Sequence, residues 1–197
     1  MIINPLDYTI TELNKLTPKK GRLLIAEPFM EDPYFKRSVV LLTEYNKKEA
    51  FGFILNKPME ITVNDIMKDF PEFNAPVYMG GPVQSDGLFY IHTQGDTIEG
   101  SQHIVDDIYW AGNFDHLKQL ITDQQIFPNE IKFFVGYSGW DFKQLEKEIE
   151  DESWIITAPN TKTLIPSTEK NLWNSTLKNM GSKYAVLSNF PEDPSLN

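Results

Sequence analysis

The sequence predicts a mixed α/β domain of the α+β class, with one β-sheet built from an initial β-meander and helices packed on it. Short apolar strands come first along the chain, and strands alternate with helices in its second half. The length of 197 residues suits one domain, and 41% of the residues are hydrophobic, which supplies a core without disulfides or metals. The glycine signatures of nucleotide-binding folds are absent, so we do not expect a doubly wound fold.

The first strands are predicted where apolar residues run without interruption. Residues 23–26 and 38–43 have the pattern of buried strands with apolar side chains on both faces. Residues 51–55 form a third strand after a polar turn at residues 46–49. The second and third strands are therefore expected to form a hairpin.

A helix is predicted to follow the hairpin. Thr62 and Asp65 have the spacing of a capping box, Ile61 can pack on Ile66 as a staple, and Pro71 ends the helix. The apolar residues of its buried face are Val63, Ile66, Met67 and Phe70.

The second half of the chain alternates strands with helices. Strands are expected at residues 77–79, 88–92, 102–105, 131–137 and 154–158. Helices are expected after the N-cap Asn113, over residues 141–150, and over residues 168–180 with Gly181 closing the last of them. Residues 21–190 thus form the main domain, and residues 191–197 form a C-terminal tail.

Residues 1–20 form an N-terminal extension. Leu6, Ile10, Leu13 and Leu16 recur at helical spacing, and Pro18 and Gly21 then break the pattern. We expect a short docking helix outside the main domain.

The charge balance argues against direct binding to nucleic acid. The chain carries 28 acidic residues against 18 lysines and arginines, a net charge of −10. Such a charge repels a phosphate backbone unless cations gather on one face, and no such gathering or helix-turn-helix pattern is present in the sequence.

Composition and termini also bear on cofactors and location. The absence of cysteine excludes thiolate nucleophiles and cysteine-based metal sites, and the three histidines lack ligand spacing, so we expect no metal and no cofactor. The first 16 residues lack the features of a secretory signal, and no apolar run approaches the roughly 18 residues of a membrane span. The expected location is the cytoplasm, away from the membrane.

Gly80-Gly81-Pro82 is open to two interpretations. Two glycines before a proline form turns in which φ is positive and no Cβ fits. The same backbone N–H groups could also receive an anion. The turn is the favoured interpretation.

Ser138 lies between a predicted strand and a helix, where a hydrolase nucleophile would stand. The nucleophile elbow needs glycine two residues later, and Trp140 occupies that place. A triad would require His92 and an acid such as Glu44 or Glu146. We favour a hydrogen-bonded structural role for His92, which closes an apolar strand, over a catalytic one.

Arg37 enters the second strand beside apolar neighbours, a few residues after Asp32, which the following Pro33 holds extended. A guanidinium there needs carboxylates or carbonyls. Glu27 and Glu44 are the nearest candidates for a structural ion pair, and recognition of an anion is the alternative.

Trp140 also has two interpretations. With Asp141 as N-cap of the next helix, Gln144 can reach back to the cap and Trp140 can pack on Leu145 as a hydrophobic staple. Alternatively, the indole forms a wall of a ligand cleft beside Gly80 and Gly81.

Five blocks of this sequence together resemble the bacterial YqgE/AlgH family. The blocks are residues 21–26, 32–39, 52–58, 80–83 and 136–146. Their order and spacing match, and the resemblance covers about residues 21–190. It implies one mixed α/β domain and the label of transcriptional regulator that members often carry, but no biochemical activity.

The chain departs from the family pattern at two places. Glu49 stands where members usually have glycine, which indicates a different hairpin turn, and Asp141-Phe142-Lys143 replace small residues after the tryptophan. The second departure puts in doubt any ligand contact made by the backbone at that helix start.

The leading hypothesis is a non-catalytic domain that binds a small ligand or a protein partner and acts indirectly in regulation. A hydrolase or transferase using Ser138 and His92 is the alternative enzyme, and a direct DNA-binding regulator is the third class. The matching blocks put the candidate binding residues at strand ends and loops. These candidates are Asp32, Phe35, Arg37, Asn56, Pro58, Gly80, Gly81, Pro82, Tyr137, Ser138 and Trp140.

Overall fold

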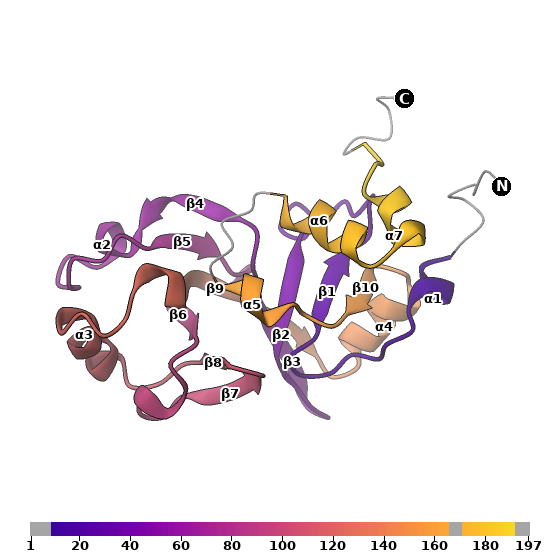
Figure 1. Cartoon of the computed structure of the whole chain (residues 1–197). Helices are drawn as coiled ribbons and strands as arrows, with labels where there is room; N and C mark the ends of the chain where they lie inside the picture. The colour runs from indigo at the N-terminus through magenta and orange to yellow at the C-terminus, as the bar shows by residue number, and fades with distance from the viewer. Residues whose placement is uncertain (1–8, 166–170, 192–197) are drawn as a thin grey trace.

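The computed structural model describes residues 9–165 and 171–191, and within them ten strands form one mostly antiparallel sheet (Figure 1). The strands are β1 (Leu23–Ala26), β2 (Val39–Tyr45), β3 (Glu49–Ile54), β4 (Pro58–Thr62), β5 (Pro76–Met79), β6 (Val83–His92), β7 (Gln102–Val105), β8 (Ile108–Trp110), β9 (Ile131–Asp141) and β10 (Trp154–Thr157). The sheet order is β10-β1-β2-β3-β9-β6-β8-β7, with β5 and then β4 attached beside β9. The predicted α+β class with one sheet is confirmed.

The helices are short, and all except α5 lie at two ends of the molecule (Figure 1). They are α1 (Ile10–Leu13), α2 (Val63–Ile66), α3 (Phe114–Thr122), α4 (Gln144–Glu150), α5 (Thr161–Leu164), α6 (Leu172–Asn179) and α7 (Ser182–Leu187), with 3₁₀ turns η2 (Gly95–Thr97) and η3 (Pro128–Glu130). In Figure 1, α2 and α3 lie at the end formed by β4 to β8, and α1, α4, α6 and α7 lie around β1 and β10.

Most predicted elements are found near their expected places. The hairpin of β2 and β3 is closed by Asn46, whose Oδ1 accepts hydrogen bonds from the N–H groups of Lys48 and Glu49. Asn113 caps α3 by accepting from the N–H of His116, and Gly181, with φ of 111°, follows the last turn of α6. The expected helix start at residue 168 and the apolar position at residue 6 lie outside the described residues.

The helix predicted over residues 62–70 is wrong in length, because α2 is a single turn. Its start is as expected, since the Asp65 carboxylate accepts from both the N–H and the hydroxyl of Thr62. Beyond it, the Asn64 side chain bonds to the backbone at Phe70, Pro71 and Phe73, which offers that backbone an alternative to a helix. Ile66 is 40% exposed and is therefore not part of the buried face that was expected for this helix.

The start of α4 and four other elements also differ from the prediction. Strand β9 continues to Asp141, and Lys143, with φ of 62°, stands at the N-cap in place of Asp141. Strands β4 and β8 and helices α5 and α7 were not predicted. β4 is mostly exposed and β8 has three residues, so neither has a strong apolar pattern.

Both faces of the sheet are covered, which explains the unbroken apolar strands. Leu23 and Ile25 of β1 face an inner cluster, whereas Leu24 packs in a second cluster under α4. The inner cluster also holds Ile104 and Ile108 from β7 and β8, at the far end of the strand order. Val105 of β7 lies directly against Gly21, which precedes β1, so the sheet curls until its two ends approach each other. A third cluster lies under α2 and α3.

The N-terminal extension lies against the free edge of β10. Nδ2 of Asn14 donates to Trp154 O and its Oδ1 accepts from Ile156 N, both at 2.8 Å. A side-chain amide thus takes the place of a further strand at an edge that would otherwise expose unpaired backbone. Leu13 is buried in the inner cluster, and the hydroxyl of Tyr184 donates to its carbonyl.

We expect Asn14→Ala to lower the free energy of unfolding by about 1 to 3 kcal/mol, because it removes two hydrogen bonds from the edge of β10. Denaturant unfolding measures this cost. Lys15→Ala, at an exposed neighbouring position, is the control and should be neutral. Equal stability of the two variants would show that the extension does not protect this edge.

Candidate functional site

The Gly80-Gly81 segment lies where the backbone of β9 crosses the connection between β5 and β6. A Cβ added at Gly80 would stand 2.2 Å from Gly136 O, and one at Gly81 would stand 2.3 Å from Tyr137 C and O. Gly80 O accepts hydrogen bonds from Ile54 N and from the Ser138 hydroxyl. The structure thus supports the interpretation as a close-packed turn, with both glycines buried against backbone.

Arg37 and Asn56 organise the chain before β2. The Arg37 guanidinium lies 4.0 Å from the ring centroid of Trp173 and donates to the carbonyls of Phe190 and Pro191. Asn56 donates to Arg37 O and accepts from Val39 N. These contacts hold the end of the described chain against the start of β2.

Of the two acids proposed for Arg37, Glu44 pairs with another cation, whereas Glu27 lies within reach of the Arg37 charge. Glu44 pairs with Lys20 at 3.0 Å, which corrects its assignment to the arginine. Burial raises the pKa of Glu27, against the opposing effects of the Phe29 N–H and the Arg37 charge. Asp32 is exposed and accepts from the N–H groups of Tyr34 and Phe35 in a local turn.

Trp140 belongs to an aromatic cluster on the outer face of the sheet. Its ring stacks on Phe35 with centroids 6.1 Å apart and meets Trp154 edge to face at 5.9 Å. The Nε1 atoms of Trp140 and Trp154 donate to the same Glu148 oxygen, at 2.7 and 2.8 Å. Trp140 is 3% exposed and shares a cluster with Leu145, so the expected packing forms from the end of β9 instead of from a helix N-terminus.

The geometry does not assemble the hydrolase arrangement of Ser138 with His92. His92 lies opposite Ile131, and Ser138 is seven positions further along β9, a separation of roughly 20 Å in a strand. Both side chains are fully buried, and the Ser138 hydroxyl donates to Gly80 O. Glu146, a proposed third member, accepts from the Tyr45 hydroxyl.

His92 has the structural environment that the sequence favours. Its Nε2 lies 3.1 Å from both Ala111 O and Ser101 Oγ, and its Nδ1 accepts from Gln94 N. Burial lowers the pKa of His92 to about 4, against the opposing effect of the Ala111 carbonyl. The imidazole is therefore neutral at physiological pH.

We expect His92 to make the protein less stable in mild acid. With a folded pKa of about 4, well below that of the unfolded chain, the unfolded state binds an extra proton between those values. Stability is fully present above about pH 6.5 and falls by about 2 kcal/mol between pH 7 and pH 5. Denaturant melts at both pH values should show a smaller fall for His92→Gln, and an equal fall would contradict the assignment.

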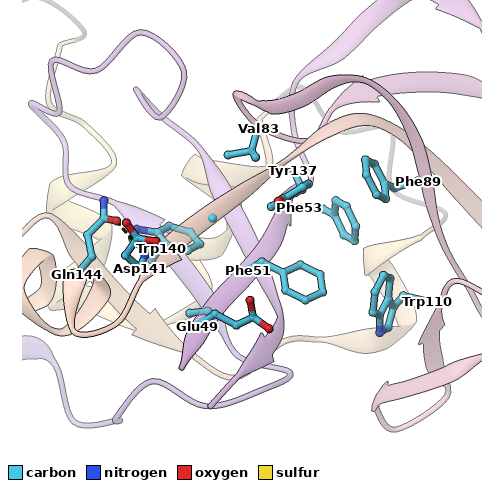
Figure 2. Close-up of a pocket in the computed structure, with 12 residues that line it drawn as sticks. Glu49, Phe51, Phe53, Val83, Phe89, Trp110, Tyr137, Trp140, Asp141 and Gln144 are labelled. Carbon is cyan, nitrogen blue, oxygen red and sulfur yellow. Dashed lines mark hydrogen bonds between the residues drawn. The ribbon is translucent and has the colours of Figure 1, made fainter. Parts of the chain in front are cut away.

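An open cleft of about 490 Å³ lies at the mouth of the inner cluster, between β3, β6, β8 and β9 (Figure 2). Its lining residues are Glu49, Ala50, Phe51, Phe53, Val83, Phe89, Trp110, Tyr137, Gly139, Trp140, Asp141 and Gln144. Alternate positions of β3 and β9 point into it, since side chains of a strand alternate between faces, and Ala50 and Trp140 of the outer cluster complete the lining. A cleft of this volume suits a small organic molecule.

Four half-buried aromatic residues form the apolar walls of the cleft. Phe51 meets Trp110 with centroids 5.1 Å apart at 71°, and it meets Tyr137 at 5.8 Å and 69°. Phe89 meets Tyr137 at 5.6 Å and 82°. Because the ring planes meet at steep angles, neighbouring rings line adjacent sides of the cleft, as Figure 2 shows for Phe51, Phe89 and Trp110. The solvent-shielded Nε1 of Trp110 donates to none of the residues that the structure describes.

The other side of the cleft is polar and acidic. Glu49 and Asp141 are direct partners across the antiparallel pair of β3 and β9. Gln144 accepts a hydrogen bond from the N–H of Asp141, drawn as a dashed line in Figure 2. None of the lining residues, all within the described part of the chain, carries a positive charge.

Of the residues predicted for binding, Tyr137 and Trp140 line this cleft. Gly80, Gly81, Pro82 and Ser138 lie where the segment after β5 contacts the backbone of β9. Asp32 and Asn56 lie near Arg37, Phe35 stacks on Trp140, and Pro58 is at the exposed start of β4. Their role in binding stays a prediction. Sequence reasoning missed Glu49, Phe51, Phe89 and Trp110 as lining residues. The available signal for the three aromatic residues was a large ring in an apolar segment, and for Glu49 it was the departure from the family pattern.

The fold and the site together define a one-domain α+β protein with a curled sheet and an aromatic, acidic cleft at its mouth. Across residues 9–165 and 171–191, none of the helices has the length and apolarity that crossing a membrane requires.

Comparison with known proteins shows the family to which this chain belongs. The model of the AlgH-like family matches residues 23–185. A UPF0301 protein of Cytophaga hutchinsonii is 45% identical, over 90% of this chain and 98% of its own length. One of Chlorobium limicola is 40% identical, over 95% of this chain and all of its own. The chain belongs to the AlgH-like family, as its five sequence blocks indicate.

Two solved structures share the fold. A crystal structure of a protein from Corynebacterium diphtheriae superimposes with a TM-score of 0.76 at 20% identity, covering 96% of this chain and all of that chain. The solution structure of AlgH from Pseudomonas aeruginosa gives 0.70 at 24% identity, covering 90% and 98%. At these identities the likeness concerns the fold.

Proposed function

We propose that this chain is a non-catalytic binding protein of the cytoplasm that takes a small ligand into the aromatic cleft and acts indirectly in regulation. The observation that carries the proposal is the open cleft of about 490 Å³ walled by four half-buried rings. Large aromatic surface that neighbouring side chains leave uncovered is what a ligand with an apolar body can bury.

The contacts around the cleft support a non-catalytic function. The Ser138 hydroxyl is buried and bonded to a backbone carbonyl, and His92 is neutral and far from it along the sheet. The cleft itself is lined by aromatic, aliphatic, amide and carboxylate side chains. Such a lining suits recognition better than nucleophilic attack.

An indirect regulatory role is supported by the position of the cleft. Its lining includes Gln144, the first residue of α4, and α4 also carries Glu148, which holds Trp140 and Trp154. A ligand in the cleft therefore contacts a helix of the outer surface, where a partner protein could sense occupancy.

Titration with 2-phenylethanol, a neutral ring-bearing probe, tests the proposal. We expect amide NMR shifts concentrated on β3, β8 and the end of β9, with a dissociation constant of about 1 mM for so small a probe. Phe51→Ala should abolish the shifts. Phe142→Ala, which removes a 61% exposed ring outside the cleft, should leave them unchanged. Absence of shifts in the cleft would overturn the proposal.

Direct recognition of DNA is not part of this function. A net charge of −10 opposes binding that depends on releasing counterions from phosphates. We expect no sequence-dependent binding to duplex DNA in gel-shift titrations at about 150 mM salt. Sub-micromolar, sequence-dependent affinity under those conditions would contradict this expectation.

A further inference from the structure

We propose that the ligand of the aromatic cleft is a small organic cation, an ammonium or guanidinium group on an apolar body. This inference rests on the proposed function and adds the chemical class of the ligand. It follows from two features of the cleft: the aromatic rings that line it, and the carboxylates of Glu49 and Asp141 at its rim.

The ring walls provide surfaces that attract a cation. Phe51, Trp110, Tyr137 and Phe89 adjoin one another at steep angles, so that their π-faces point in different directions around the cleft. The negative face of an aromatic ring attracts an organic cation within about 6 Å of its centroid, and tryptophan is the strongest such partner. Each of these rings is half-buried and keeps part of its surface open to solvent.

The rim supplies the matching charge. Glu49 and Asp141 are opposite each other on adjacent strands, which puts two carboxylates on the same face. Like charges directly opposite across two strands repel each other. A cation between them would remove this repulsion, and the lining offers no lysine, arginine or histidine to do so.

Glu49 places one of the carboxylates directly beside the aromatic rings. Glu49 and Phe51 are two residues apart on β3 and both line the cleft, and Figure 2 shows the carboxylate extended beside the Phe51 ring. A ligand whose apolar body lies against Phe51 and Trp110 would bring an attached ammonium group to this carboxylate. An anionic ligand would meet two like charges there.

Three probes of similar size and different charge test the inference: 2-phenylethylammonium, 2-phenylethanol and 3-phenylpropionate. By NMR titration of the full chain at low salt, we expect the cation to bind about tenfold more tightly than the alcohol, and the anion more weakly than the alcohol. Raising the salt to about 0.5 M should weaken binding of the cation and leave binding of the alcohol unchanged.

Glu49→Gln keeps the shape of the side chain and removes its charge. We expect it to bring the affinity for the cation close to that for the alcohol, whose own affinity should not change. Glu72→Gln is the control, since it removes the same charge from an exposed position that does not line the cleft. Equal affinities for the three probes would overturn the cation inference while leaving the cleft as a binding site. Failure of every probe would overturn the proposed function itself.

Discussion

Trp140→Ala is expected to lower the free energy of unfolding by about 3 to 5 kcal/mol, the range for removing a large buried ring from a core. The indole is 3% exposed and packs against Phe35 and Trp154. Its loss would leave a cavity between the sheet and α4. Guanidinium melts monitored by far-UV circular dichroism measure the change in midpoint.

Two further variants separate packing from hydrogen bonding in this cluster. Trp140→Phe keeps most of the ring volume and loses the bond to Glu148, so we expect a cost of about 1 to 2 kcal/mol. Glu148→Ala leaves the indole N–H groups of both Trp140 and Trp154 without their acceptor, and should cost more than Trp140→Phe. An alanine midpoint at residue 140 within error of the wild type would refute the structural role and leave only the contribution to the cleft.

Gly80→Ala is expected to destabilise the fold by about 3 kcal/mol or more, above the usual range for an overpacked core. The new methyl would stand 2.2 Å from Gly136 O, a backbone atom that cannot rotate away as a side chain can. Gly80 N also donates to Val135 O, so the segment is fixed on β9 and cannot move outward without breaking the pairing.

Gly139→Ala, on the same crossing strand, is the matched control. The nearest atom to its added methyl is a ring carbon of Tyr137 at 3.2 Å, which a small rotation of that side chain can accommodate. We expect a cost below about 1 kcal/mol for this change. Thermal melts of both variants compare their losses of stability. Similar losses at the two positions would show that close contact with the backbone of β9 is not what requires glycine at position 80.

Features that depend on short stretches of sequence could be predicted for this chain. Capping by Asn113, closure of α6 by Gly181, and the buried strands β1 and β2 all depend on neighbours within a few residues. The strands could be recognised because both faces are covered, which makes every position apolar. The helix after Thr62 was overestimated because the Asn64 side chain competes with the helix for the backbone, and periodicity does not report such competition.

Several residues of the family blocks hold the conformation of the backbone. Gly80, Gly81 and Ser138 are needed where two backbones touch, and Arg37 and Asn56 hold the entry to β2 through carbonyl and amide contacts. A sequence shows that such residues are unusual, but not whether their polar groups are already satisfied by the fold.

The sequence by itself determined the fold class and most of the strand positions, because these follow from local patterns of apolar residues and turns. Its five blocks indicated the family through their resemblance to other members. The cleft was decided only by the tertiary structure. Its walls come from β3, β6, β8 and β9, which the curl of the sheet brings together. The opposition of Glu49 to Asp141 depends on the register of two strands whose paired residues here are 92 positions apart in the chain (141 − 49). Whether an aromatic side chain fills a core or borders an open space depends on which distant strands pack beside it, and that information is not contained in its neighbours along the chain.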